Sequence, residues 1–125
     1  MSIKFGTDGW RAIMAEDFTF ANVRMVAYAI AKYVKDAQKA SKGVVIGYDT
    51  RFLSDKFAET CARVLLGADI KVLLMERDAP TPVTAFTAVK RNTAGAIMLT
   101  ASHNPPYYNG IKFIPEYGGP ASPQI

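Results

Sequence analysis

The chain has 125 residues, half of them hydrophobic, and a formal net charge of +4. This length suits one domain with a single packed core. No apolar run approaches the roughly 20 residues of a membrane-spanning helix, and the residues after Met1 lack the apolar core of a secretory signal. One cysteine, Cys61, cannot form an internal disulfide, so we expect a protein of the reducing cytoplasm.

The positive charge does not by itself indicate a nucleic-acid partner. Lysines and arginines are scattered from Lys4 to Lys112, without a basic run or a nucleic-acid motif. The charge suits an anionic small ligand at least as well, and it is equally typical of a solvated surface. We therefore expect neither nucleic acid nor a membrane among the partners.

The first predicted elements are two short strands around a glycine-rich turn. Residues 3–14 are predicted to form a strand, the turn 6–9 (Gly-Thr-Asp-Gly) and a return strand from Trp10, which together make a short N-terminal hairpin. Two glycines around an aspartate allow the backbone amides to face an anion. An ordinary hairpin turn explains the same residues.

Helical and strand-like patterns alternate through the middle of the chain. The predicted helices cover residues 20–39, 54–66 and 82–91. The predicted buried strands cover residues 44–48, 70–75 and 95–99. Thr19, Ser54 and Thr81 are candidate N-caps of the three helices, and Gly67 is the candidate residue past the end of the second.

The apolar residues of each predicted helix fall on one face. The third helix is predicted to bury Val83, Phe86 and Val89 against the sheet. Cys61 lies within the apolar stripe of the second helix, which indicates a small core residue rather than a reactive thiol.

The connections between the strands predict the fold. Because helices join them, the three strands should be parallel with right-handed crossovers. Residues 110–114 return after only a loop and should form an antiparallel edge strand. The predicted class is α/β: a three-layer α/β/α arrangement with a mixed, mostly parallel four-stranded sheet, plus the N-terminal hairpin. Residues 115–125 lack periodicity and are interpreted as a truncated linker after a domain of residues 1–114.

Polar residues follow two of the predicted strands directly. Asp49 and Arg51 come after the strand of residues 44–48, and the segment 100–106 (Thr-Ala-Ser-His-Asn-Pro-Pro) follows the strand of residues 95–99. Open α/β sheets bind ligands at the carboxyl ends of their strands. We therefore expect the functional site at this edge of the sheet.

Ser102 and the chain's only histidine, His103, are the chemically suggestive residues there. A serine hydrolase is a weak hypothesis, because side chains of adjacent residues usually point apart and the G-x-S-x-G elbow is missing. A serine that carries a phosphoryl group needs cationic and hydrogen-bonding neighbours, which His103, Asn104 and Lys112 could supply. A plain Asn-Pro turn with a solvated serine stays open as an alternative.

Two stretches resemble the α-D-phosphohexomutases, the family of phosphoglucomutases and phosphomannomutases. Residues 100–105 (Thr-Ala-Ser-His-Asn-Pro) and 108–113 (Tyr-Asn-Gly-Ile-Lys-Phe) are similar to the phosphoserine loop of this family. Residues 5–11 (Phe-Gly-Thr-Asp-Gly-Trp-Arg) are similar to its opening signature, although Ala12 follows where many relatives carry glycine. The resemblance covers essentially the whole chain, but only the first domain of the family.

A third element, Gly47, Asp49 and Arg51, also resembles the family. For Asp49 and Arg51 we expect an ion pair that braces the loops of the site, rather than a direct part in catalysis.

The resemblance implies a role for each matched residue. Ser102 would carry the phosphoryl group and, through a phosphate oxygen, bind Mg²⁺. His103 and Lys112 would assist proton transfer and stabilise charge near the reacting oxygens. Arg11 would hold phosphate together with Lys112 and Asn104, and Asn104 would also fix the loop through its backbone. The implied catalytic residues are therefore Ser102, His103, Lys112 and Arg11.

The resemblance also implies an intramolecular phosphotransferase that interconverts hexose 1-phosphate and hexose 6-phosphate through a hexose bisphosphate. Hexose 1,6-bisphosphate would be the activator and a phosphosugar the substrate. The family takes its other Mg²⁺ ligands from an Asp-x-Asp-x-Asp loop, which this sequence lacks. We therefore expect a first domain that works with the remaining domains of the same chain and is inactive alone. The alternative is a non-catalytic α/β module that binds phosphate or a phosphosugar.

Overall fold

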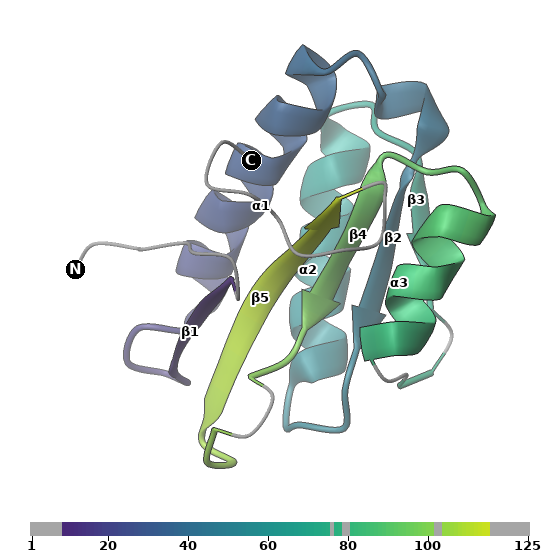
Figure 1. The fold of residues 1–125 in the computed structure, drawn as a ribbon. Coiled ribbons are helices and arrows are strands. Elements are labelled where there is room, and N and C mark those ends of the chain that lie inside the picture. Colours follow the sequence, from purple (N-terminus) through teal and green to yellow (C-terminus); the bar gives the residue numbers. More distant parts are fainter. Residues whose placement is uncertain (1–8, 76, 79–80, 102–103, 116–125) are drawn as a thin grey trace.

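The computed structural model describes residues 9–75, 77–78, 81–101 and 104–115 (Figure 1). The elements in chain order are β1 (Trp10–Ile13), α1 (Phe20–Asp36), the short 3-10 helix η1 (Ala40–Lys42), β2 (Val44–Tyr48), α2 (Ser54–Gly67), β3 (Val72–Leu74), α3 (Thr81–Lys90), β4 (Gly95–Leu99) and β5 (Tyr108–Pro115). None of the helices in these ranges combines the length and the apolar character needed to cross a lipid bilayer. The predicted turn 6–9, apart from Gly9, and the predicted linker, apart from Pro115, lie outside the described residues.

The five strands form one mixed sheet in the order β1-β5-β4-β2-β3. β2 is parallel to both β3 and β4, whereas β5 is antiparallel to β4 and to β1. The α/β class and the three parallel strands are therefore confirmed. The prediction of four strands with the last one at the edge is wrong, because β1 pairs with the outer side of β5. Trp10 lies opposite Ile111, and Ile13 lies opposite Tyr108.

The alternation of buried and exposed residues in β1 explains why it joins the sheet. Trp10 and Ala12 are buried, while Arg11 between them is exposed. The indole of Trp10 stacks on the ring of Phe18 with 4.7 Å between the ring centroids. A separate hairpin would leave this apolar face in water, and among the described residues no such hairpin exists.

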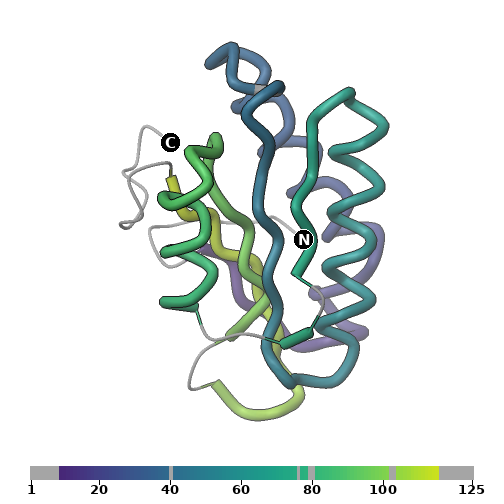
Figure 2. Tube along the Cα trace, turned by 90° about the vertical axis from the view of Figure 1, so that its right-hand side faces the viewer, coloured from purple at the N-terminus to yellow at the C-terminus, as the bar shows by residue number. Residues whose placement is uncertain are grey.

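Helices cover both faces of the sheet (Figure 2). α1 and α2 lie on one face, over the larger core cluster, which includes Ile46, Ile97 and Phe113. α3 lies on the other face, over a smaller cluster that includes Val45 and Met98. The three layers follow from this, since neighbouring residues of β2 and β4 point to opposite faces.

Cys61 of α2 is fully buried in the larger core cluster. Burial raises the pKa of its thiol to about 12, so the thiolate is disfavoured. The prediction of a core residue is confirmed.

The helix ends differ in part from the sequence prediction. Thr19 is the N-cap of α1 as predicted, and its side chain accepts a hydrogen bond from the backbone N of Asn22 at 3.2 Å. Ser54 is instead the first residue of α2, because the N-cap is Leu53 in a left-handed conformation (φ 65°). Gly67 is the last residue of α2, and the positive φ past its end falls on Asp69 (φ 62°).

The buried face of α3 also differs from the prediction. Val83, Phe86 and Val89 are 45, 64 and 50% exposed, and the sheet is contacted instead by Thr84 and Ala88. The reason is the close approach of α3 to β2. A Cβ added to Gly47 would collide with the side chain of Thr84, so only small residues of α3 fit against the sheet.

Candidate functional site

The carboxyl ends of β2 and β4 lie side by side, as the polar segments predict. Tyr48 pairs with Leu99, and the backbone N of Asp49 donates to the carbonyl oxygen of Leu99 at 3.2 Å. The segment of residues 100–107 then leads from β4 to β5 at this edge. Asp49 and the start of this segment are therefore brought together.

Ser102 and His103 lie outside the described residues. The described residues on either side of them, Ala101 and Asn104, are joined by a hydrogen bond from the backbone N of Asn104 to the carbonyl oxygen of Ala101 at 3.0 Å. The geometry of the site is therefore built from the residues around this pair.

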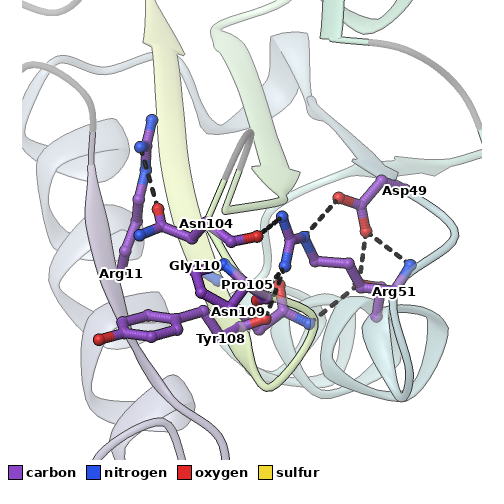
Figure 3. A network of polar contacts seen from close by, with 9 residues as sticks. Arg11, Asp49, Arg51, Asn104, Pro105, Tyr108, Asn109 and Gly110 are labelled. Atoms are coloured by element: carbon purple, nitrogen blue, oxygen red, sulfur yellow. Dashed lines mark hydrogen bonds and ion pairs between the residues drawn. The ribbon is translucent and has the colours of Figure 1, made fainter.

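Arg51 holds the second half of the connecting segment through its guanidinium group (Figure 3). Nη2 donates to the carbonyl oxygen of Asn104 at 2.7 Å, and Nη1 donates to the carbonyl oxygens of Pro105 at 2.8 Å and Tyr108 at 3.2 Å. The Arg51 side chain is only 13% exposed. The planar guanidinium offers several donors in a fixed geometry, so one side chain fixes three carbonyl groups of residues 104–108.

Asp49 orients Arg51. Its Oδ2 lies 3.4 Å from Nε of Arg51, and its Oδ1 accepts hydrogen bonds from the backbone N of Arg51 at 3.0 Å and from Oγ of Ser54 at 2.8 Å. The predicted ion pair between Asp49 and Arg51 is therefore present. The carboxylate also lies beside the first turn of α2, where a negative charge is favoured by the helix dipole.

A buried polar contact connects this network to β5. Nδ2 of Asn109 donates to Oγ of Ser54 at 2.9 Å, and Oδ1 of Asn109 accepts from the backbone N of Gly110 at 2.8 Å. Asn109 and Ser54 are both fully buried. The sequence analysis does not predict this pair. A signal was available, because Asn109 shares its strand face with the apolar residues Ile111 and Phe113, and a polar side chain on a buried face needs a hydrogen-bond partner.

Arg11 reaches the same segment from β1. Its Nη1 donates to Oδ1 of Asn104 at 3.2 Å, and the two side chains face each other in Figure 3. Arg11 lies opposite Gly110 in the sheet. A Cβ at Gly110 would lie 2.9 Å from Cγ of Arg11 and 2.7 Å from the carbonyl oxygens of Thr100 and Trp10. The missing side chain of Gly110 therefore leaves room for the side chain of Arg11 to pass over β5.

Lys112 lies on the same sheet face as Arg11. It is opposite Met98 and two residues beyond Gly110, so it is a diagonal neighbour of Arg11 across β1 and β5. Arg11 is exposed and Lys112 half-buried. Two cationic side chains and the amide of Asn104 provide hydrogen-bond donors of the kind that phosphate oxygens accept.

These donors suit an anion rather than Mg²⁺, which prefers oxygen ligands. Among residues 9–75, 77–78, 81–101 and 104–115, no three His, Cys, Asp or Glu side chains form a group that could hold a metal. The carboxylate of Asp49 is already engaged by Arg51 and Ser54. The described residues thus do not fit a Mg²⁺ site of their own.

Comparisons with known proteins identify the family of the chain. The family described as phosphoglucomutase/phosphomannomutase, alpha/beta/alpha domain I, matches residues 2–125. A solved structure titled as a putative phosphomannomutase from Thermus thermophilus superimposes with a TM-score of 0.94 at 41% identity, covering 99% of this chain and 28% of that one.

Two relatives extend the comparison. A phosphoglucomutase of Staphylococcus saprophyticus is 38% identical over 98% of this chain and 22% of its own length. A probable phosphomannomutase of Haemophilus influenzae is 43% identical over 72% of this chain and 18% of its own length. The chain thus spans about a fifth to a quarter of the proteins that it resembles. It belongs to the phosphoglucomutase/phosphomannomutase family, in which it corresponds to domain I.

Proposed function

We propose that this chain is the phosphoserine domain of a phosphohexomutase that interconverts hexose 1-phosphate and hexose 6-phosphate. The observation that supports the proposal is the pair of cationic side chains, Arg11 and Lys112, on one sheet face beside the segment that joins β4 to β5. Ser102 and His103 belong to that segment by sequence. A phosphorylated serine requires such cations, because the negative charge of the phosphoryl group must be offset before that group can be transferred.

The proposed reaction consists of two phosphoryl transfers. The bond between phosphorus and Oγ of phosphorylated Ser102 breaks while a hydroxyl oxygen of the hexose monophosphate bonds to phosphorus. His103 and Lys112 assist removal of the hydroxyl proton, and Arg11 and Lys112 offset charge on the phosphoryl oxygens. The proton that the hydroxyl loses passes to the released Oγ of Ser102. After the bisphosphate has reoriented, the bond between its other phosphoryl group and the sugar oxygen breaks while Oγ of Ser102 bonds to that phosphorus, and the proton passes from Oγ to the released sugar oxygen.

The remaining parts of the active site are proposed to come from outside this chain. The chain covers 18 to 28% of the relatives compared above, so a protein of the relatives' length that contains this chain (the family-length protein) has room for further domains. We infer that those domains hold most Mg²⁺ ligands and read the sugar, with Ser102 adding a ligand through its phosphate. Mg²⁺, when bound, offsets phosphoryl charge. Hexose 1,6-bisphosphate would phosphorylate Ser102 and so activate the enzyme.

The proposed division of the chain follows from this. Residues 1–114 would form the domain and residues 115–125 the beginning of a linker to the next one, although Pro115 is still paired with Gly95 as the last residue of β5. We expect the 125-residue chain alone to be inactive as a mutase. The whole protein would work in the cytoplasm on a phosphosugar.

The carrier role of Ser102 can be tested by phosphopeptide mapping. The family-length protein is incubated with hexose 1,6-bisphosphate and Mg²⁺, digested and analysed by mass spectrometry. We expect one phosphoryl group on Ser102 and none in the Ser102→Ala variant, while Ser54→Ala, which removes a buried hydroxyl of the bracing network, still accepts the group at Ser102. An unmodified Ser102, with the protein still able to bind a phosphosugar, would favour the non-catalytic binding module.

A further inference from the structure

The outer face of α3, formed by Pro82, Val83, Phe86 and Val89, is apolar although it points away from the core. Val83, Phe86 and Val89 are 45, 64 and 50% exposed, and Pro82 is exposed as well. Lys90 adds the one charge of the helix, at its C-terminal end.

The opposite side of α3 is also apolar in part, which makes the helix unusual. Thr84 and Ala88 pack on β2 and β4. A helix that is apolar on both sides is typical of one buried between two layers of protein. By contrast, the outer side of α1 mixes exposed Met25 and Tyr28 with charged residues, including Lys32 and Asp36, which form an ion pair.

We propose that the outer face of α3 is the contact surface for another domain of the same polypeptide in the family-length protein. The length of the relatives supports this occupant, because this chain accounts for only 18 to 28% of them. The partner surface is expected to be apolar, since Val83, Phe86 and Val89 offer no hydrogen bonds. The inference rests on the proposed place of the chain in a longer enzyme, but not on the chemistry of Ser102.

The position of α3 relative to the candidate site supports the same occupant. α3 follows β3 and precedes β4, two parallel strands, so its first turn lies at the edge of the sheet where these strands end. Asp49 and Arg51 lie at this edge. A domain that completes the active site at this edge would therefore lie next to Val83, in the first turn of α3. If the contact continued along the helix, it would also cover Phe86.

Thiol labelling at position 86 tests the inference. The Phe86→Cys variant is prepared in the 125-residue chain and in the family-length protein. In the latter, any cysteine outside residues 1–125 is replaced by serine. Cys61 should add little labelling of its own, because it is fully buried and burial raises the pKa of its thiol to about 12. We expect the variant thiol to react with a maleimide at least 10-fold more slowly in the family-length protein, since the added domain covers it.

Lys32→Cys is the matched control, because it lies on an exposed helix position of α1 with a charged neighbour. Its labelling rate should be the same in both proteins. Equal rates for Phe86→Cys in the two proteins would overturn the inference, and so would equal slowing at both positions. Concentration-dependent protection of the 125-residue variant would also overturn it, because a second copy would then be the occupant. None of these outcomes depends on phosphorylation of Ser102.

Discussion

Arg51 connects three parts of the chain through a single guanidinium group. It is paired with Asp49 after β2, and it donates to carbonyl groups on both sides of the turn that leads into β5. These carbonyls belong to Asn104, Pro105 and Tyr108, which follow Ser102 and His103 in the sequence. The proposed phosphoserine segment is therefore anchored on its C-terminal side by a side chain that does not itself need to touch the substrate.

Arg51→Lys is the sharpest test of this anchoring. Lysine keeps the positive charge but cannot reproduce the planar fork, so up to three carbonyls, two of them in partly buried hydrogen bonds, lose their donor. We expect the free energy of unfolding of the chain, measured by urea denaturation, to fall by about 2 to 3 kcal/mol. In the family-length protein kcat should fall at least 10-fold with little change in KM, because the carrier residue is misplaced while sugar-binding parts remain.

Arg63→Lys, on an exposed position of α2, is the control for the chemical change. Its effect should stay within about 0.5 kcal/mol, as for other surface substitutions. Similar losses for Arg51→Lys and Arg63→Lys would mean that the observed hydrogen bonds do not anchor the segment.

At the scale of the elements, two glycines have different roles. Gly110 is required by close packing, whereas Gly67 is not. Gly110 lies in β5, where an added Cβ would meet the carbonyl oxygens of Thr100 and Trp10 and the side chain of Arg11. Gly67 ends α2, and an added Cβ there would meet nothing within 4 Å. The same substitution should therefore have opposite effects at the two positions.

Gly110→Ala should destabilise the chain by about 1 to 3 kcal/mol, because the strands β1 and β5 must move apart. It should also weaken the contact between Arg11 and Asn104 and hence mutase activity of the family-length protein. Gly67→Ala should stabilise the chain by about 0.5 to 1 kcal/mol, because alanine loses less conformational freedom in a helix. Thermal unfolding followed by circular dichroism measures both. A gain for Gly110→Ala, or a loss for Gly67→Ala, would contradict the packing described here.

The errors of the sequence prediction also belong to this scale. Hydrophobic spacing predicts the three α-helices and the strands β2 to β5 to within a few residues, but it does not predict η1 and cannot assign the faces of α3. Its apolar residues point outward because Gly47 lets the helix approach β2 so closely that only Thr84 and Ala88 fit between them. Likewise, the sequence cannot predict that β1 pairs with β5, because strand pairing over almost the full length of the chain leaves no local signal.

At the scale of the whole molecule, the sequence predicts which segments come together at the candidate site, but not the contacts that join them. The polar residues after β2 and β4 are expected at one edge of the sheet, since parallel strands bring their carboxyl ends together, and the structure places Asp49 beside Leu99 there. The contact between Arg11 and Asn104, 93 residues apart, needed the structure, as did the buried pair of Asn109 and Ser54. The roles of Ser102, His103 and Lys112 stay predictions from the family resemblance.

Phosphorus NMR of the family-length protein tests the central claim most directly. With Mg²⁺ and a trace of hexose bisphosphate, the 1-phosphates of glucose, mannose and glucosamine are offered in turn to the wild type and to Ser102→Ala, and the 125-residue chain is run beside them. We predict that the wild type converts at least one sugar to its 6-phosphate, whereas Ser102→Ala and the 125-residue chain convert none. Full conversion by Ser102→Ala, or no conversion of any sugar by the wild type, would contradict the account.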